Sequence, residues 1–210
     1  MVKKTKEEAL ETRNLLLDTA ECVFNEKGVS GTTLADIASA AGVTRGAIYW
    51  HFKNKADLFE AMCERVRLPM ETMIAAGAED DVTDPIGELR KAADYFFLKV
   101  STDPHHHKVF DILFNKCEFV DQLGPIIDRD ARVRKDFRER FERIFINAVR
   151  LGQLPINTNV PLAVNAYLSY SKGIMRSWLL EPESFDLYRD GVRMMEGFLD
   201  MLTQSQAFLD

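Results

Sequence analysis

Apolar side chains recur at helical spacing along the whole chain. The first stripe consists of Leu16, Ala20, Val23 and Phe24, and Gly28 follows it. Recurrence every three or four positions is typical of an amphipathic α-helix, and a glycine just past the stripe is typical of a helix end. No segment shows the alternation expected of a strand. The pattern therefore predicts an all-α protein of about nine helices.

Residues 32–58 contain two short helical patterns joined by a glycine. Thr33 and Asp36 have the spacing of a capping box, and the apolar face behind them ends at Gly42. Thr44 is suited to cap a second helix, which runs from residue 45 to about residue 51. Two short helices joined by a tight turn form a helix-turn-helix, whose second helix reads the major groove of DNA. We therefore expect a three-helix DNA-binding domain over residues 1–54.

A longer pattern begins after Asn54 and runs over residues 55–76. At about 1.5 Å per residue, a helix of this length reaches roughly 33 Å and can connect two domains. Pro69 lies inside it, so we expect the helix to bend or break there. A bend at that point suits a lever between the domains, and it suits a purely structural kink equally well.

Five further helical patterns follow and are assigned to a second domain, residues 55–210. The last two, 162–180 and 187–202, are apolar around most of their circumference, so they need cover on more than one face. A symmetric dimer with two such helices from each subunit would provide it; a fully buried monomer core is the alternative. The predicted interface residues are Leu162, Tyr167, Trp178, Met195, Leu199 and Leu202.

The second short helix carries polar and aromatic residues that suit DNA contact. Arg45 and Tyr49 are placed to reach base edges, and Thr44, Trp50 and the N-terminal lysines to reach phosphate. The alternative is that Tyr49 and Trp50 are core aromatics. The full predicted set is Lys3, Lys4, Thr33, Thr44, Arg45, Gly46, Tyr49, Trp50, His51 and Lys55.

Composition changes this picture only a little. The net charge is −6, but residues 1–55 hold eight Lys/Arg against seven Asp/Glu, so this part is slightly positive. A neutral-to-basic head on an acidic body is compatible with DNA binding if the basic groups share a face. No apolar run is long enough for a membrane span and no signal peptide is evident. Three scattered cysteines indicate reduced thiols, as in a cytoplasmic protein.

The run GVTRGAIYWHFKNKADL resembles the signature of the TetR family of bacterial transcriptional repressors. The wording TRGAIYWHF, with KTKEEALETR and NKCEF, is similar to the branch of AcrR- and TtgR-like repressors of multidrug efflux pumps. The resemblance is densest over about the first sixty residues. It implies a helix-turn-helix domain, then a larger helical-bundle domain that binds a ligand and dimerises.

Phenylalanines on three successive helices suggest an apolar cavity in the body, although ordinary core packing explains any single one of them. TetR-like proteins hold their ligand in such a cavity, and that resemblance adds five candidates: Val66, Met70, Leu168, Lys172 and Arg176. The last two could instead pair with carboxylates. The other candidates are Phe96, Phe97, Phe110, Phe114, Phe137 and Phe141.

The sequence does not favour a catalytic or a metal-binding site. His105, His106 and His107 are consecutive, so on a helix they point in different directions and cannot converge on one metal ion. Nothing beside Cys117 suggests a reactive thiol. No nucleophile elbow, phosphate loop, zinc-protease or dinucleotide motif is present. We therefore expect no enzyme, no cofactor and no metal.

The sequence thus predicts a homodimeric repressor that binds a two-fold symmetric double-stranded operator. An apolar or aromatic compound would release it, and a multidrug efflux operon is the expected target. One alternative is a TetR-like regulator that senses a metabolite, such as a fatty acyl or aromatic compound. The other is a helical small-molecule-binding protein that does not bind DNA.

Overall fold

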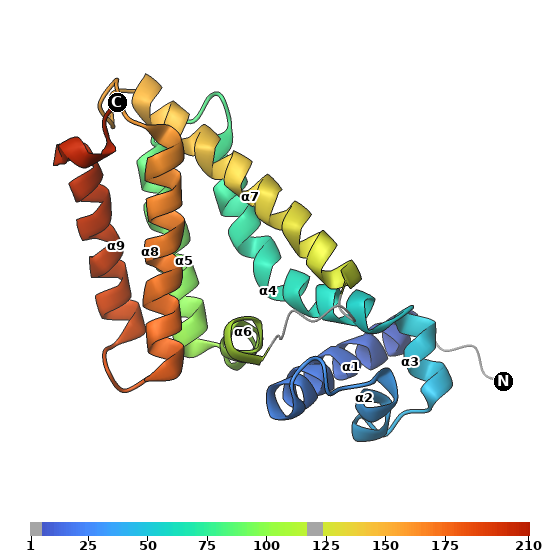
Figure 1. The fold of residues 1–210 in the computed structure, drawn as a ribbon. Coiled ribbons are helices and arrows are strands. Elements are labelled where there is room, and N and C mark those ends of the chain that lie inside the picture. The colour runs from blue at the N-terminus through green and yellow to red at the C-terminus, as the bar shows by residue number, and fades with distance from the viewer. Residues whose placement is uncertain (1–5, 117–123) are drawn as a thin grey trace. The chain divides into compact units, whose positions relative to one another are not determined.

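The structure is a computed structural model, which describes residues 6–116 and 124–210, without the side chains of residues 124–134. Within these ranges the chain forms nine α-helices and no β-strand, which confirms the all-α prediction (Figure 1). Lys3, Lys4 and Cys117 lie outside the described residues. The helices are α1 Lys6–Lys27, α2 Leu34–Ala40, α3 Arg45–His51, α4 Lys55–Ala78, α5 Pro85–Thr102, α6 Pro104–Asp111, α7 Gly124–Arg150, α8 Val160–Leu180 and α9 Leu187–Gln204.

Local sequence rules place several helix ends. Gly28 and Gly42 have φ values of 76° and 67°, the left-handed conformation that glycine adopts at low cost after a helix. Pro85 occupies the first turn of α5, where its missing N–H removes no helical bond. The helix α4, however, continues through Pro69 to Ala78, so the break that we considered does not occur.

The chain packs as two compact units. Unit 1 comprises residues 1–67 and 104–130, and unit 2 comprises residues 68–103 and 131–210. Unit 1 therefore contains α6, which packs against α1 although the sequence assigned it to the second domain. Sequence position alone does not show this contact, because α1 and α6 are separated by four intervening helices.

Unit 1 has a continuous apolar core beneath the helix-turn-helix. Phe24, Ile37, Ile48 and Leu58 are each almost completely buried, and they come from α1, α2, α3 and α4. Burying such side chains contributes roughly 1.5–3 kcal/mol each relative to exposure. The core therefore holds α2 and α3 against α1 and α4 and leaves their outer faces in solvent.

Unit 2 is organised around aromatic rings. Tyr167 of α8 lies at its centre, with ring centroids of Phe141, Phe145 and Phe198 at 5.3, 6.0 and 6.2 Å. Phe97 of α5 packs against Gly191 of α9, where an added Cβ would lie 3.3 Å from the ring. This glycine lets α5 and α9 approach closely. No helix in the described part of the chain is long and apolar enough to cross a membrane.

Candidate nucleic-acid interface

Side-chain hydrogen bonds cap the starts of both α2 and α3. The Asp36 N–H donates to Thr33 Oγ1 at 3.2 Å, and the Thr33 N–H donates to Asp36 Oδ2 at 2.8 Å, which completes the predicted capping box. The hydroxyl and backbone N–H of Thr33 together hold the pKa of Asp36 below its usual value. At α3, the Ala47 N–H donates to Thr44 Oγ1 at 3.2 Å.

The helix α3 buries one side and exposes the other. Ile48 is completely buried, and Phe52, which follows α3, is nearly so. Tyr49 and Trp50, in contrast, are 47% and 73% exposed. Large aromatic side chains lose favourable burial when they lie in water, so this degree of exposure is unusual for a purely structural role. The alternative in which both rings belong to the core is therefore excluded.

The exposed face of α3 combines charge, aromatic surface and a helix start. Thr44, Arg45 and Gly46 are exposed in its first turn. The Arg45 guanidinium lies 5.7 Å from the centroid of the Tyr49 ring, and the rings of Trp50 and His51 meet edge to face at 4.6 Å. These residues form one surface, which we call the α3 face: Thr44, Arg45, Gly46, Tyr49, Trp50 and His51. Such a face can enter a major groove and supply both phosphate and base-edge contacts.

Two predicted DNA contacts have other partners in this structure. The hydroxyl of Thr33 belongs to the capping box of α2. Lys55 is half-buried, and its Nζ donates to the carbonyls of Val29, Ser30 and Thr32. Because these bonds use the ammonium group, we leave Lys55 out of the proposed phosphate contacts. Burial lowers its pKa below the usual value.

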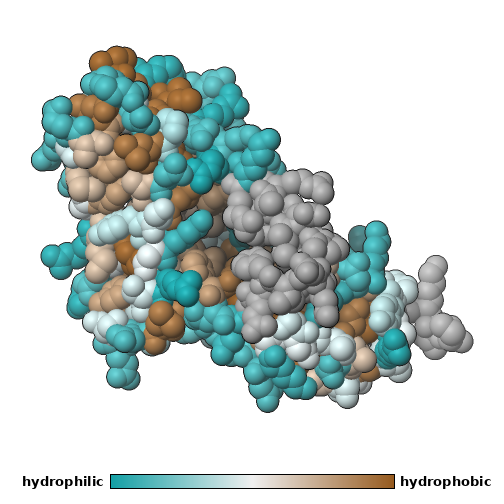
Figure 2. Space-filling view, in the orientation of Figure 1, coloured by the Kyte–Doolittle hydropathy of each residue, from teal (hydrophilic) through white to brown (hydrophobic). Residues whose placement is uncertain are grey.

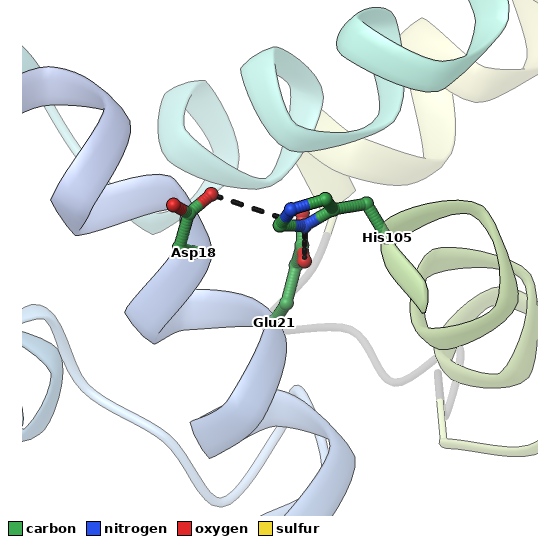
Figure 3. A group of neighbouring side chains, drawn as sticks. All are labelled: Asp18, Glu21 and His105. Carbon is green, nitrogen blue, oxygen red and sulfur yellow. Dashed lines mark hydrogen bonds and ion pairs between the residues drawn. The ribbon is translucent and has the colours of Figure 1, made fainter. Parts of the chain in front are cut away.

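Sequence reasoning missed a polar cluster in unit 1, drawn in Figure 3. Asp18 and Glu21 of α1 meet His105 of α6, and the His105 Nδ1 lies 2.7 Å from Glu21 Oε2. Glu21 is completely buried. The three side chains offer ligand atoms within 4.8 Å of one another. His105 thus converges with residues from a distant segment instead of with its neighbours, and no sequence signal points to that contact.

The cationic partner of this cluster is Arg65 of α4. Its Nη1 lies 2.6 Å from Asp18 Oδ1, and its Nη2 forms an ion pair with Glu21 and lies 3.2 Å from His105 Nδ1. Burial acts to lower the pKa of Arg65, but the hydrogen bond with Asp18 and the charge of Glu21 outweigh it and raise the pKa. Arg65 thus contacts all three side chains of the group, which already has a cationic partner within the protein. The cluster therefore links α1, α4 and α6 through ion pairs and hydrogen bonds.

The predicted ligand-binding residues divide between the two units. Val66, Phe110 and Phe114 belong to unit 1, and the other eight belong to unit 2. In unit 2, Phe97 and Phe141 are buried in the ring-rich core, whereas Lys172 and Arg176 are exposed. An open hollow of about 220 Å³ in unit 2 is lined by other residues, namely Ile86, Arg90, Gln153, Leu154, Leu199 and Thr203. The predicted cavity stays a prediction.

The predicted dimer residues are mostly interior. Five of the six (Tyr167, Trp178, Met195, Leu199 and Leu202) are at least nine-tenths buried within the chain itself, and Leu162 is 44% exposed. Buried side chains have little surface left for a second copy. The sequence pattern indicated that several faces of these helices are buried. It did not indicate which faces pack within the same chain and which would contact a second copy.

The fold and the α3 face define a helix-turn-helix DNA-binding protein. Residues 16–62 match the family model for bacterial regulatory proteins of the tetR family, and residues 84–204 match the C-terminal region of MAATS-type transcriptional repressors. The chain belongs to the TetR family and is a transcriptional regulator, not an enzyme.

Individual relatives are similar in sequence to this protein over nearly its whole length. The regulator TtgR of Pseudomonas putida is 41% identical over 207 residues, covering 99% of both chains. Among solved structures, the repressor MexZ of Pseudomonas aeruginosa is 34% identical with a TM-score of 0.79 and covers 95% of this chain and 98% of its own. A complex of SmeT with triclosan is 32% identical with a TM-score of 0.83 and covers 95% of both.

Proposed function

We propose that this protein represses a multidrug efflux operon from the cytoplasm and leaves its operator when an apolar or aromatic compound binds. The exposed α3 face is the single observation that carries the DNA-binding half of this proposal. The relatives support the other half. MexZ is described as a repressor responsible for antibiotic resistance, and SmeT as a repressor of a multidrug efflux pump that was solved with triclosan.

The operator contacts follow from the chemistry of the α3 face. Arg45 can donate two parallel hydrogen bonds to a guanine edge, and Tyr49 lies one helical turn later on the same side. Thr44 presents a hydroxyl and the N-terminus of α3 to phosphate. Trp50 and His51 provide further phosphate contacts at the end of the helix, together with the N-terminal lysines.

A homodimer supplies the two-fold symmetry that the operator requires. The exposed apolar side chains of α8 and α9 are Leu162, Tyr170, Leu180, Tyr188, Met194 and Met201. Figure 2 shows hydrophobic atoms interspersed with hydrophilic ones over these two helices. Gly173 and Gly197 are exposed, and an added Cβ would meet nothing within 4 Å at either position. Small residues among apolar ones permit close packing of helices from a second copy.

The effector would be an apolar or aromatic compound held in the C-terminal region. The ring-rich interior of unit 2 supports this chemistry, because aromatic side chains are common in sites for such ligands. The eight predicted residues that belong to unit 2 are the first positions to test. A ligand can release the operator only to the extent that it binds the released state more tightly.

The test is a titration of a labelled DNA fragment from upstream of the protein's own gene, followed by fluorescence anisotropy. We expect sequence-specific binding by a dimer, and release by triclosan or by another apolar drug. Arg45→Ala should weaken operator binding by about 1–3 kcal/mol and relax specificity at one position. Arg143→Ala, which removes an exposed cation from α7, away from the α3 face and from the proposed dimer helices, is the matched control.

Three outcomes would change the proposal. Unchanged operator preference in Arg45→Ala would remove that residue from base recognition. Release by fatty acyl compounds but by no drug would favour the metabolite-sensing alternative. Size-exclusion chromatography with light scattering measures the oligomeric state. A monomeric protein that binds the operator with full affinity would contradict the proposed dimer.

A further inference from the structure

Lys55 is the first residue of α4, and its ammonium group is held by the loop between α1 and α2. Its Nζ donates to the carbonyl oxygens of Val29 at 2.7 Å, Thr32 at 2.8 Å and Ser30 at 3.3 Å. A lysine ammonium has three N–H donors. The three carbonyl oxygens therefore accept hydrogen bonds from all three N–H donors of the Lys55 ammonium group.

The loop that receives Lys55 is tightly built. Val29 and Thr32 are at most 1% exposed, and the Thr32 hydroxyl donates to the Gly28 carbonyl at 2.7 Å. At Gly31, an added Cβ would lie 2.8 Å from the Lys27 carbonyl oxygen, closer than side chains allow. The loop thus has one well-defined path, and this path directs three carbonyls toward the same point.

This contact joins the two ends of the helix-turn-helix. The loop leads directly into Thr33, the N-cap of α2, and Lys55 follows directly after the turn that ends α3. Residues 33–54 therefore begin and end at the same hydrogen-bonded centre. Fixing both ends of a segment removes conformational freedom that it would otherwise keep, and here the segment includes the α3 face.

We propose that Lys55 is a positioning residue for operator reading, which holds both ends of the helix-turn-helix together and so sets the orientation of α3. It does this without contacting phosphate itself, which reverses the role that the sequence predicted for it. The proposal rests on the proposed DNA-binding function. It concerns how α3 is presented, and it makes no assumption about the effector.

The test compares Lys55→Met with Lys53→Met. Methionine keeps most of the apolar stem of lysine and removes the three donors, and Lys53 is an exposed lysine of the same turn. Binding to the operator and to random DNA is measured over a salt series at a temperature where each variant is folded. For Lys55→Met we expect operator affinity to fall about tenfold or more, since hydrogen bonds of a charged group are lost. Random DNA should bind nearly as before, with an unchanged salt slope.

Two results would overturn the proposal. If Lys55 contacts phosphate, Lys55→Met should weaken operator and random DNA equally and reduce the salt slope by about 1. If Lys55 only stabilises the fold, the ratio of specific to non-specific affinity should stay the same in the folded variant. Lys53→Met shows how large the effect of losing an exposed lysine is in this turn.

A second measurement needs no variant and applies even if Lys55→Met fails to fold. In the wild-type protein without DNA, the NMR signal of the Lys55 ammonium should be visible and slow to exchange with water, and it should keep its position when operator is added. A rapidly exchanging ammonium that becomes protected only with DNA would contradict the proposal. Absence of specific binding by the wild-type protein would contradict the proposed function and would leave this measurement of Lys55 interpretable.

Discussion

The two compact units of this protein differ in what they bury. In the described part of unit 1 the buried polar side chains include a carboxylate and an imidazole, Glu21 and His106, besides Thr12 and Thr32. In the described part of unit 2 the buried polar side chains are Asn147 and Thr158, neither of which carries a charge. Unit 2 relies instead on the rings around Tyr167. Charge is thus buried in the unit that presents the α3 face.

The difference has a physical reason. Apolar contacts are less directional than hydrogen bonds, and the core of unit 2 is held by burial and by ring-to-ring contacts. Hydrogen bonds and ion pairs act over narrow ranges of distance and angle, and a buried charge that loses its partner is costly. The contacts of Arg65 and Lys55 therefore favour one arrangement of α1, α4 and α6 and one arrangement of the helix-turn-helix. Reading a DNA groove requires that kind of fixed orientation.

The largest expected effect tests the buried charge. Arg65→Met should lower the free energy of unfolding by about 3 kcal/mol, because the fully buried Glu21 loses a permanent cation and keeps a hydrogen bond with His105. Adding Glu21→Met to this variant should restore most of the loss, since no buried charge then remains. Urea unfolding measures both. Arg90→Met is the control, because Arg90 pairs with Glu196 at 2.8 Å on the surface and should cost less than about 1 kcal/mol. A double variant as unstable as Arg65→Met would contradict the electrostatic account.

The ring core of unit 2 should respond more moderately and without rescue. Phe198 contacts the rings of Tyr167, Tyr170 and Phe208. Phe198→Leu keeps most of the apolar volume and removes three ring contacts, each worth roughly 0.5–1.5 kcal/mol, so we expect a loss of about 2 kcal/mol. The same urea experiment measures it. A loss below that of Arg90→Met would show that ring geometry contributes little and that burial alone holds unit 2.

A smaller effect tests a single cap in unit 1. Thr33→Ala removes the hydroxyl from the capping box and should cost about 1 kcal/mol. Amide exchange of α2 should accelerate, while the ring core of unit 2 is unaffected. Ser39→Ala, an exposed hydroxyl later in α2, is the control. Equal exchange rates in the two variants would indicate that packing, not the cap, fixes the start of α2.

The smallest effect at neutral pH concerns Tyr167. Burial, with the nearby charge of Glu196, raises the pKa of Tyr167 above its ordinary value of 10.0. Below pH 10 the tyrosine is neutral in both states and its contribution is fully present. Above pH 10 the unfolded state loses the proton first, so stability falls as the pH rises. Thermal melts from pH 8 to 11 should show a shallower decline for Tyr167→Phe than for the wild type, and identical slopes would contradict this.

Several features could be predicted from the sequence because neighbours along the chain decide them. Helix periodicity, the Thr33–Asp36 box, the cap at Thr44 and the glycine turns depend on contacts within four residues. The same short range made the exposed face of α3 readable, since Ile48 and Phe52 fixed which side is inward. The helices of the described residues, with the helix-turn-helix among them, thus follow from local rules and from the family resemblance that those residues carry.

Tertiary structure alone decided the rest. Lys55 looks like an exposed DNA-binding lysine until the loop of Val29 to Thr32 is folded beside it, and His105 looks like one of three unrelated histidines until α6 meets Glu21 of α1. Tyr167 and Met195 look like interface residues until their own chain covers them. In each case the sequence supplies the chemical group, and segments far apart in the chain determine what the group contacts. Those long-range contacts depend on the packing of the whole core, which no local pattern encodes.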